Sequence, residues 1–414
     1  MHIKIATLNG ESISDLAVHD TMLIGDLKCN LSGIVGIPAY RQQLFHHDLL
    51  LLGNMSLHDA HIEDGAVITM AISASMMVLT SSIDATAKVW NGSTGECCLT
   101  CRGHGAMLNT AALSPNGAFI LTASRDKTAK LWSVDNGECL QTYNGHESHV
   151  TCALFVEDGR LVITTSKDLT GRLWDTATGE LLRILVGHTD HVTSALNLQG
   201  SSLVLTGSRD GTAILWNIAT GDKLRSFPHE SPRGAGWLSM ALAPNRASFV
   251  TASRVSGVVN HWCIESGESL QTFEGHTGGV AEATFSFDGV LLISASRDGT
   301  AKLWQVSTAI CVHTFVGHTP ETEVTSAALS SDGSCAVTGA SDFTARLWST
   351  ESGICLRTLE GHTSAVKHVM FAPRDSDRVL SISDDGTAKI WSISSGECKA
   401  NLEHDGALQS LTLM

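Results

Sequence analysis

The chain has little charge, little proline and few aromatic residues. Charged residues make up 17% and aromatic residues 5% of its 414 residues, whereas hydrophobic residues make up 43%. This balance provides enough apolar surface for a large core and a small second domain. Glycine, with 38 residues, far exceeds proline, with 7, which is typical of many tight turns and not of a disordered, proline-rich chain.

Long apolar runs and an excess of cations are also absent. No stretch approaches the roughly 20 apolar residues that cross a bilayer. The first ten residues, MHIKIATLNG, lack the basic start and apolar run of a secretory signal. The formal net charge of −15 disfavours attraction to nucleic acids and anionic membranes. We therefore expect a cytoplasmic protein, with the nucleus as a second compartment, that binds no membrane and no nucleic acid directly.

Motifs of common enzyme classes are missing. The sequence has no G-x-S-x-G, no phosphate-binding G-x-x-x-x-G-K-[ST] and no H-E-x-x-H. His46-His47 and the pair His58 and His61 have no completing ligands at a trusted spacing. We predict that the protein is not an enzyme and holds neither a metal nor a cofactor.

The eleven cysteines do not form a pattern of disulfides or metal ligands. Five of them follow a recurring tryptophan by seven residues, namely Cys97, Cys139, Cys311, Cys355 and Cys398. Equivalent positions in successive repeats are too far apart to bridge. A single C-x-x-C, formed by Cys98 and Cys101, is weak evidence for metal without a second pair. The cysteines are predicted to be reduced and structural.

Tryptophan recurs at intervals of 42 to 46 residues. Eight of the nine tryptophans follow this period: Trp90, Trp132, Trp174, Trp216, Trp262, Trp304, Trp348 and Trp391. Trp237 is the exception. Such a period is typical of repeats of four short strands that must stack on one another to bury their faces.

One repeat, residues 111–146, shows how the strands are arranged. A first strand ends at Leu113, and further strands are expected over 118–123, 129–132 and 139–143, with turns at 115–117, 126–127 and 136–137. Short strands separated by turn residues predict an antiparallel meander.

The order Gly-His, then Ser-x-Asp, then Trp resembles the WD40 repeat family, whose fold is the β-propeller. Only Trp174-Asp175 keeps the literal Trp-Asp pair. The resemblance implies a buried hydrogen-bonded chain from tryptophan through serine and histidine to aspartate. The matching sets are His104, Ser124, Asp126 and Trp132; His146, Ser166, Asp168 and Trp174; His188, Ser208, Asp210 and Trp216; His276, Ser296, Asp298 and Trp304; and His362, Ser383, Asp385 and Trp391.

Two repeats depart from this pattern. His318 has Asp342 and Trp348, but Ala340 replaces the serine. In the repeat that ends at Trp262, Pro228-His229 replaces Gly-His and Val255 stands at the aspartate position. We expect this second repeat to be the loosest.

The two ends of the repeat region complement each other. Ser82, Asp84 and Trp90 have no Gly-His before them, and His404 has no Ser-x-Asp-Trp after it. If His404 completes the first set, residues 74–414 form eight blades, and residues 406–414 supply the missing strand of the first blade. Such an exchange removes a free sheet edge and closes the ring. The fold class is therefore mainly β, with an eight-bladed propeller closed by the C-terminal strand.

Residues 1–73 lie outside the repeats and form a small α+β domain. Strands are expected over 1–8, 12–18, 42–45 and 66–72, with a helix over 24–35. This order resembles ubiquitin, through Thr7-Leu8-x-Gly10, Gly36-Ile37-Pro38, Gln42-Gln43-Leu44 and Ser56-Leu57. The resemblance implies a β-grasp fold and a recognition patch at Leu8, Phe45 and Ala71. The alternative is that these apolar residues pack against the propeller.

The residue between Ser and Asp is expected to face the mouth of the ring. Those positions are Ile83, Arg125, Lys167, Arg209, Arg254, Arg297, Ser341 and Asp384. Five consecutive cations can capture carboxylates or phosphates, and His149 and His191 lie near them. The alternative is that these side chains pair with neighbouring acids.

Together these features predict a monomeric, non-catalytic scaffold within larger complexes. The propeller would bind acidic or phosphorylated peptides, and the first domain would recruit a second partner, such as ubiquitin–proteasome machinery. An alternative is a ribosome large-subunit assembly factor, because the architecture is similar to the notchless family. That family uses an acidic residue of the small domain, and only Asp48 matches it here.

Overall fold

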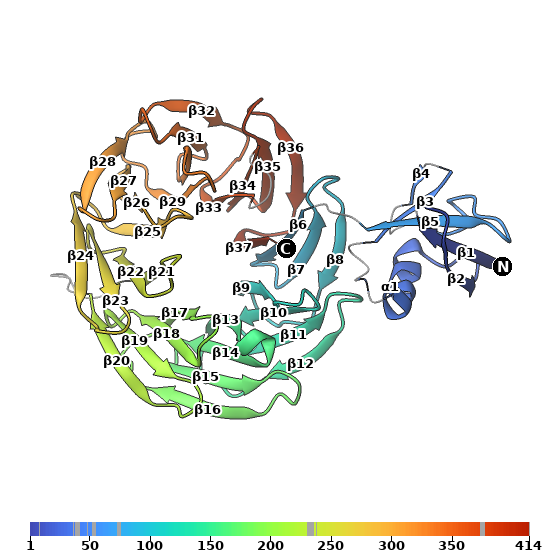
Figure 1. Ribbon diagram of the computed structural model, residues 1–414, viewed down its shortest axis with the longest axis horizontal. Helices are drawn as coiled ribbons and strands as arrows, with labels where there is room; N and C mark the ends of the chain where they lie inside the picture. The colour runs from blue at the N-terminus through green and yellow to red at the C-terminus, as the bar shows by residue number, and fades with distance from the viewer. Residues whose placement is uncertain are drawn as a thin grey trace.

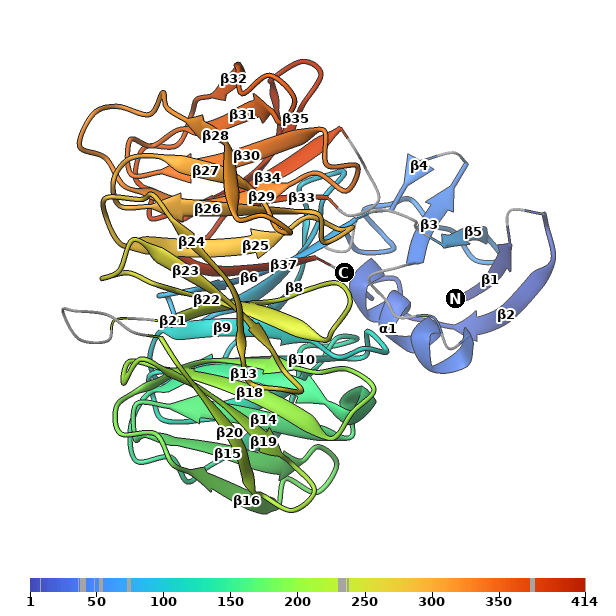
Figure 2. The ribbon, with the colours of Figure 1, turned by 60° about the vertical axis from the view of Figure 1, so that its left-hand side comes forward.

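The structure consists of an N-terminal lobe and a ring of β-sheets (Figure 1). It is a computed structural model that describes residues 1–7, 9–35, 37, 42–47, 49–51, 55–72, 76–229, 236, 238–372 and 377–413. The lobe ends with the strand that finishes at Ile72, and the first strand of the ring begins at Met77. In both ribbon views the lobe stands to one side of the ring (Figures 1 and 2).

The N-terminal lobe is a five-stranded sheet with one helix. Its elements are β1 (His2–Thr7), β2 (Ser12–Ala17), α1 (Ile24–Val35), β3 (Gln42–His46), β4 (Leu49–Leu50) and β5 (Val67–Ile72). The strand order is β2-β1-β5-β3-β4, with β1 and β5 parallel at the centre. The predicted helix is confirmed, and its Leu27 and Leu31 are buried together with Ile3 and Ile5 of β1. Leucines four residues apart lie on one helical face, which explains this packing.

The ring contains eight four-stranded antiparallel sheets, which we number in chain order. Sheet 1 contains β6 (Met77–Ser82), β7 (Ala87–Asn91), β8 (Cys97–Cys101) and β37 (Leu408–Leu413). Sheet 2 contains β9 (Leu108–Leu113), β10 (Phe119–Ser124), β11 (Ala129–Ser133) and β12 (Cys139–Tyr143). Sheet 3 contains β13 (Val150–Val156), β14 (Leu161–Ser166), β15 (Thr170–Asp175) and β16 (Leu181–Val186), with a 3-10 turn at Glu157–Gly159. Sheet 4 contains β17 (Val192–Asn197), β18 (Leu203–Ser208), β19 (Thr212–Asn217) and β20 (Lys223–Pro228).

The other four sheets repeat this arrangement. Sheet 5 contains β21 (Leu238–Leu242), β22 (Ser248–Ser253), β23 (Val258–Cys263) and β24 (Ser269–Glu274). Sheet 6 contains β25 (Val280–Phe285), β26 (Leu291–Ser296), β27 (Ala301–Gln305) and β28 (Ile310–Phe315). Sheet 7 contains β29 (Val324–Leu329), β30 (Cys335–Ala340), β31 (Ala345–Ser349) and β32 (Cys355–Leu359). Sheet 8 contains β33 (Val366–Phe371), β34 (Arg378–Ser383), β35 (Thr387–Ser392) and β36 (Cys398–Glu403).

The hydrophobic cores lie between neighbouring sheets. One cluster, for example, joins Leu121 and Leu131 of sheet 2 to Val162 and Trp174 of sheet 3. The periodic tryptophans are thus buried against the preceding sheet, and Trp174 is 2% exposed. The meander predicted from the repeat is confirmed. Trp237 lies outside the described residues, as do Gly36 and Pro38 of the ubiquitin-like match.

The C-terminal strand completes the first sheet. Strand β37 pairs antiparallel with β6, with Leu411 opposite Thr80. The Ser410 hydroxyl is 2.7 Å from the Ser81 hydroxyl and accepts a hydrogen bond from the amide of Ala111 in sheet 2. Because β37 occupies the inner edge of sheet 1, the two ends of the ring region are joined by a ladder of backbone hydrogen bonds.

No described helix combines the length and apolar character needed to cross a bilayer.

Deletion of residues 406–414 should lower the thermal midpoint by at least several degrees. The deletion uncovers the inner edge of β6 and removes Leu408, which is fully buried; removal of one buried leucine side chain typically costs about 2–5 kcal/mol. The measurement is differential scanning calorimetry of the deletion beside Gln409→Ala, a matched change on the same strand. An unchanged midpoint for the deletion would contradict closure by β37.

Candidate functional site

A buried hydrogen-bonded chain runs through each sheet from a tryptophan to a histidine. In sheet 2 the Trp132 indole donates to the Thr122 hydroxyl at 2.8 Å, and His104 Nε2 lies 2.8 Å from that hydroxyl. His104 Nδ1 lies 2.7 Å from the Asp126 carboxylate. Since a carboxylate only accepts, Nδ1 donates the proton, and the hydroxyl donates to Nε2.

The chain recurs with threonine or serine as the bridging hydroxyl. The equivalent sets are His404, Thr80, Trp90 and Asp84; His146, Thr164, Trp174 and Asp168; His188, Thr206, Trp216 and Asp210; His276, Ser294, Trp304 and Asp298; His318, Thr338, Trp348 and Asp342; and His362, Ser381, Trp391 and Asp385.

The predicted bridging serines are therefore wrong. In sheet 2 Trp132 pairs with Ile120, so that Thr122 is its diagonal neighbour on the same face of the sheet, and Ser124 lies one step beyond. The same correction applies to Ser82, Ser166, Ser208, Ser296 and Ser383. A signal was present in the sequence, because a threonine or serine precedes the tryptophan by ten residues in seven repeats and by eleven in the repeat of Trp262.

The serine of Ser-x-Asp instead fixes the turn before the aspartate. Ser124 donates to the carbonyl of Ala106 at 2.9 Å and accepts from the amide of Asp126. In sheet 7 Ala340 cannot do this, and the Ser341 hydroxyl accepts from the amide of Glu323 at 2.9 Å. The hydrogen-bonded chain of sheet 7 is thus complete without a serine at position 340.

The aspartates stay ionised inside this framework. Burial alone would raise the pKa of Asp126, but hydrogen bonds from His104, Thr128 and the amide of Gly105 hold it well below its usual range. Equivalent hydrogen bonds also hold the pKa values of Asp168, Asp210 and Asp298 well below their usual range. They are structural acceptors that remain charged at neutral pH.

Sheet 5 has the histidine but no carboxylate. His229 Nδ1 lies 3.0 Å from the Thr251 hydroxyl, which accepts from Trp262, and the side-chain amide of Asn260 donates to the same nitrogen. His229 Nε2 is buried and has no partner among the described residues. Burial without a counter-ion lowers the pKa of His229 to about 4.

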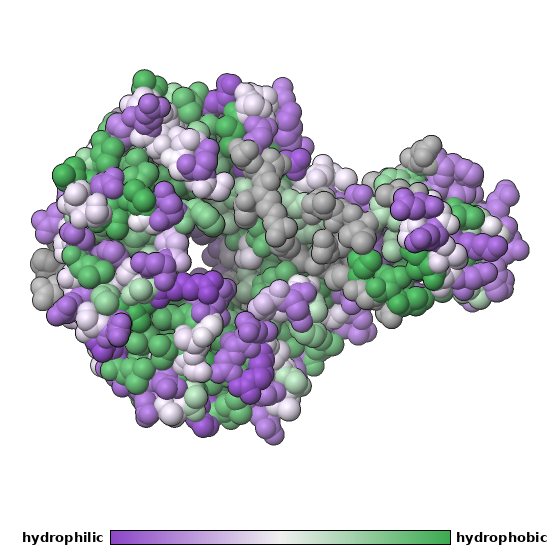
Figure 3. All heavy atoms as spheres, in the orientation of Figure 1, coloured by the Kyte–Doolittle hydropathy of each residue, from purple (hydrophilic) through white to green (hydrophobic). Residues whose placement is uncertain are grey.

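The residues between Ser and Asp lie next to the start of the inner strands. The amides of Lys167 and Arg209 donate to the carbonyls of His149 and His191, which directly precede β13 and β17. The structure therefore brings the predicted histidines and cations together in sheets 3 and 4. Figure 3 shows an opening in the middle of the ring with hydrophilic residues beside it.

The charged side chains of this rim differ in their partners. Arg297 is paired with Glu323 at 2.8 Å, and Asp384 is paired with Lys367 at 2.9 Å. Arg125 donates only to the neutral Asn109 side chain. Among the described residues, no carboxylate lies within ion-pair distance of Arg125, Lys167 or Arg209, and Arg209 Nε is buried without a partner. Of the four cations between Ser and Asp that are named here, only Arg297 pairs with a neighbouring acid in the described chain, as the alternative interpretation expected.

Burial and the cations of this rim both lower the pKa of a neighbouring histidine, His149. Partial burial lowers the pKa of His149, and Lys167, Arg125 and Lys127 lower it further. His149 Nδ1 is buried without a hydrogen-bond partner among the described residues. The pKa of Arg254 is also lowered, by desolvation and by the nearby Arg297. We call Arg125, Lys167, Arg209 and His149 the open basic rim.

Two of the three residues of the predicted recognition patch of the N-terminal lobe lie within the described part of the chain. Phe45 on β3 pairs with Thr69, and Ala71 on β5 pairs with Gln43, so that Phe45 and Ala71 share one face of the sheet. Both are half-buried, whereas their neighbours Leu44 and Met70 point into the core. Leu8, the third member, lies outside the described residues, as does Asp48.

No group of three or more histidine, cysteine or acidic side chains is placed to hold a metal in the described part of the chain. Burial raises the pKa of Cys101 to about 12, which keeps this thiol protonated. The ten described cysteines are all free.

Comparisons with known proteins match the repeats. The family described as "WD domain, G-beta repeat" matches residues 95–133, 137–175, 179–217, 267–305, 309–349 and 353–392, which is more than half of the chain. The crystal structure of the computationally designed Ika8 protein is 29% identical, with a TM-score of 0.66 over 78% of this chain and 95% of that protein. Mainly-β architecture with repeated four-stranded sheets is typical of a WD40 propeller.

The curated relatives match over shorter segments. Eukaryotic translation initiation factor 3 subunit I of Danio rerio is 39% identical over 80 residues, which is 19% of this chain and 24% of the relative. Nuclear distribution protein PAC1-2 of Uncinocarpus reesii is 37% identical over 82 residues, 19% of this chain and 18% of the relative. The chain thus spans less than a quarter of the length of each of these two relatives.

Replacing the bridging hydroxyl should destabilise a sheet, whereas the Ser-x-Asp position should matter little in sheet 7. Thr338→Val leaves Trp348 Nε1 and His318 Nε2 without their partner, and each unsatisfied buried group costs about 1–3 kcal/mol. Ala340→Ser is the matched change two residues away, and because it restores the serine that the other sheets carry at this position, its effect should be smaller than that of Thr338→Val. Urea-unfolding midpoints of both variants test this, and equal midpoints for Thr338→Val and the wild type would contradict it.

Acid should weaken the protein in part through His229. The folded-state pKa of about 4 lies below the ordinary value of 6.5, so the unfolded chain binds a proton first as pH falls. Stability from this group is full above pH 6.5 and is lost between pH 6.5 and 4, by on the order of 3 kcal/mol. His229→Gln removes this titration, so its thermal midpoint should fall less than that of the wild type over this window. Parallel midpoint curves would contradict the assignment.

Proposed function

This chain belongs to the WD40 family, and on that basis we propose that it is a non-catalytic scaffold whose ring and N-terminal lobe hold different protein partners. Proteins of this family are generally non-enzymatic, and the buried histidines and aspartates of this chain are occupied by hydrogen bonds to one another. The threonine hydroxyl beside each of these histidines also accepts from a tryptophan indole and is buried, so it is held within the framework and is not exposed to a substrate.

The ring is proposed to be an eight-bladed propeller over residues 74–414, closed by the C-terminal strand. The eight four-stranded sheets, the pairing of β37 with β6 and the 3.1 Å contact of His404 with Asp84 support this proposal. A closed ring presents the inner-strand starts of all sheets at one rim, which suits the capture of an extended peptide.

The first ligand of the propeller is proposed to be an acidic or phosphorylated peptide at the open basic rim. The observation that carries this proposal is the lack of an acidic partner for Arg125, Lys167 and Arg209 among the described residues, on a chain with a net charge of −15. Guanidinium and ammonium groups bind carboxylates and phosphates through charge-assisted hydrogen bonds. Arg254, Arg297 and His191 flank this rim and would extend the contact.

The N-terminal lobe is proposed to be a ubiquitin-like domain over residues 1–73 that recruits a second partner, such as ubiquitin–proteasome machinery. The β2-β1-β5-β3-β4 order with a parallel central pair supports a β-grasp fold. Phe45 and Ala71 offer an apolar surface on the exposed face. We place the protein in the cytoplasm and nucleus as a monomeric subunit of larger complexes. One relative, a translation initiation factor subunit, is named as part of such a complex.

Affinity capture with mass spectrometry tests both surfaces. Reversal of Arg125, Lys167 and Arg209 to Glu should abolish capture of one partner set and of an octaglutamate probe, while Phe45→Asp should remove only the second set. Lys399→Glu, on outer strand β36, is the matched charge control and should retain both sets. Unaltered capture by the triple variant would contradict the rim site. Recovery of large-ribosomal-subunit precursors in place of proteasomal receptors would favour the ribosome-assembly alternative.

A further inference from the structure

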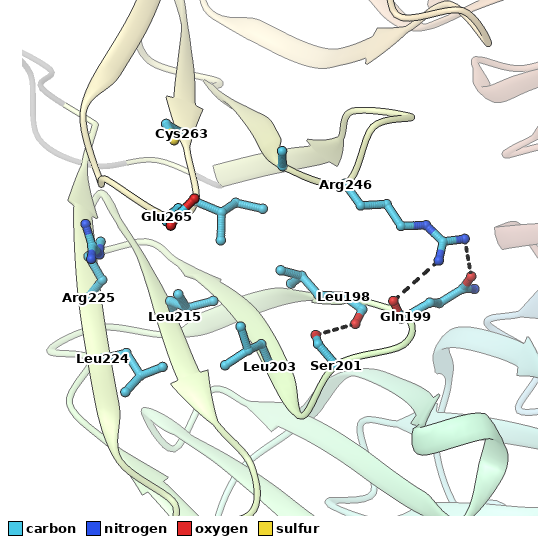
Figure 4. A pocket seen from close by; sticks show the side chains of 12 residues that line it. Leu198, Gln199, Ser201, Leu203, Leu215, Leu224, Arg225, Arg246, Cys263 and Glu265 are labelled. Atoms are coloured by element: carbon cyan, nitrogen blue, oxygen red, sulfur yellow. Dashed lines mark hydrogen bonds between the residues drawn. The ribbon is translucent and has the colours of Figure 1, made fainter.

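An apolar groove lies between sheets 4 and 5, and its lining runs from the turns after their inner strands to outer strand β20 (Figure 4). Its volume is about 580 Å³, which is within the range of sites that hold ligand groups. The groove lies between the strands of sheet 4 that carry Leu203, Leu215 and Leu224 and the turn of sheet 5 that carries Ile264 and Glu265. None of these residues belongs to the open basic rim.

The floor of the groove is the edge of the core between these two sheets. Leu198, Leu215 and Ile264 are 4–7% exposed and belong to one buried cluster. Leu224 lies at the edge of the groove with 49% of its surface exposed. A large aliphatic side chain laid into the groove would therefore be surrounded by leucine and isoleucine atoms and would lose its contact with water.

Side chains on several outer strands bond to the next sheet, and Arg225 at the groove differs from them. At four of the eight steps between sheets, the side chain nine residues after the periodic tryptophan donates from the outer strand of one sheet to a turn carbonyl of the next sheet, whereas Leu99, Gln141 and Ala400 at the same position make no such bond among the described residues. The bonds are Arg183 to Ala219, Gln271 to Ser307, His313 to Glu351, and Arg357 to Ile393 and Ser394, at 2.6–3.4 Å.

Arg225 occupies the same position between sheets 4 and 5 but makes no such bond. It lies over Gly267, where a Cβ atom would come within 2.6 Å of its Cδ. Its guanidinium has no hydrogen bond or ion pair with any described residue, whereas Arg246 across the groove donates to Gln199 at 2.8 Å. Glu265 is the acidic residue of the lining. The lining thus carries two arginines, one glutamate and an apolar floor.

We propose that this groove is a second binding site, for a partner peptide that presents a large aliphatic side chain next to a carboxylate. The aliphatic side chain would fill the space over Leu198, Leu215 and Ile264. The carboxylate would accept hydrogen bonds from Arg225, whose fork of donors matches a carboxylate and is otherwise unused. We favour a peptide over a small buried ligand because Leu224 is exposed at the edge of the groove, where it can contact the backbone of a bound peptide.

Cys263 supplies a built-in reporter of occupancy. It lines the groove, is half-buried, and its sulfur accepts a hydrogen bond from the amide of Ser266 at 3.5 Å. These bonds from Ser266 lower the pKa of Cys263 and so favour its reaction with iodoacetamide. Cys311 and Cys355 lie on outer strands of sheets 6 and 7, away from the groove, and serve as internal controls.

The experiment measures alkylation rates of these three cysteines in the full-length protein by peptide mass spectrometry. The probe is the capped peptide Gly-Glu-Leu-Glu-Leu-Gly at millimolar concentration, with twins in which glutamine replaces glutamate or alanine replaces leucine. We expect the probe to slow alkylation of Cys263 at least threefold, with Cys311 and Cys355 unchanged, and both twins to protect much less.

Variants assign the effect to Arg225. Arg225→Gln should abolish the protection, while Arg357→Gln, the same strand position between sheets 7 and 8, should leave it intact. The triple rim variant should also retain it, which separates this site from the proposed rim site. Equal protection by the glutamine twin, no protection by the probe, or equal protection by free octanoate would overturn the proposal. The comparison of probe and twins requires only the wild-type protein.

Discussion

The ring depends on the hydrogen bond between a buried imidazole and a carboxylate, which is present at seven of the eight steps from sheet to sheet. The histidine stands on the connection that leaves the outer strand of one sheet, and the aspartate stands in a turn of the following sheet, as with His404 after β36 and Asp84 in sheet 1. A charge-assisted bond of this kind is worth roughly 1.5–3 kcal/mol. Because it joins two sheets, it specifies their relative position as well as their stability.

Sheet 5 shows what happens when this interaction is missing. The hairpin between β22 and β23 carries one more residue, Thr251 and Trp262 being eleven apart where other sheets have ten. His229 turns its other nitrogen to the hydroxyl and leaves Nε2 unsatisfied. The same sheet forms one wall of the open groove, where Arg225 lies over Gly267 in the turn of sheet 5 but makes no hydrogen bond to it. A weakened polar connection and an open apolar seam thus occur at the same step of the ring.

The sequence predicted this architecture because its signals are local and repeated. The tryptophan period, the turn residues and the histidine–aspartate spacing each follow from one sheet and recur in the others. The bridging hydroxyl was predicted wrongly because Thr122 and Ser124 lie on the same face of β10, and strand alternation cannot separate residues two apart. The partner of each rim cation could not be predicted either. Whether Arg297 meets Glu323 depends on the distance between neighbouring sheets, which no spacing within one repeat encodes.

The charged side chains of this protein therefore fall into two groups, those that pair with a histidine or an oppositely charged group in the part of the chain that the structure describes and those that do not. The aspartates, most of the repeat histidines, Arg297 and Asp384 are satisfied by groups of the same chain, and their removal would change stability before recognition. Arg125, Lys167 and Arg209 of the open basic rim, and Arg225 of the groove, have no acidic partner among the described residues. A ligand carboxylate or phosphate could therefore bind these cations without displacing an acidic partner within the described part of the chain. The imidazole–carboxylate pairs, by contrast, join neighbouring sheets, and their hydrogen-bonding groups are already used within the framework.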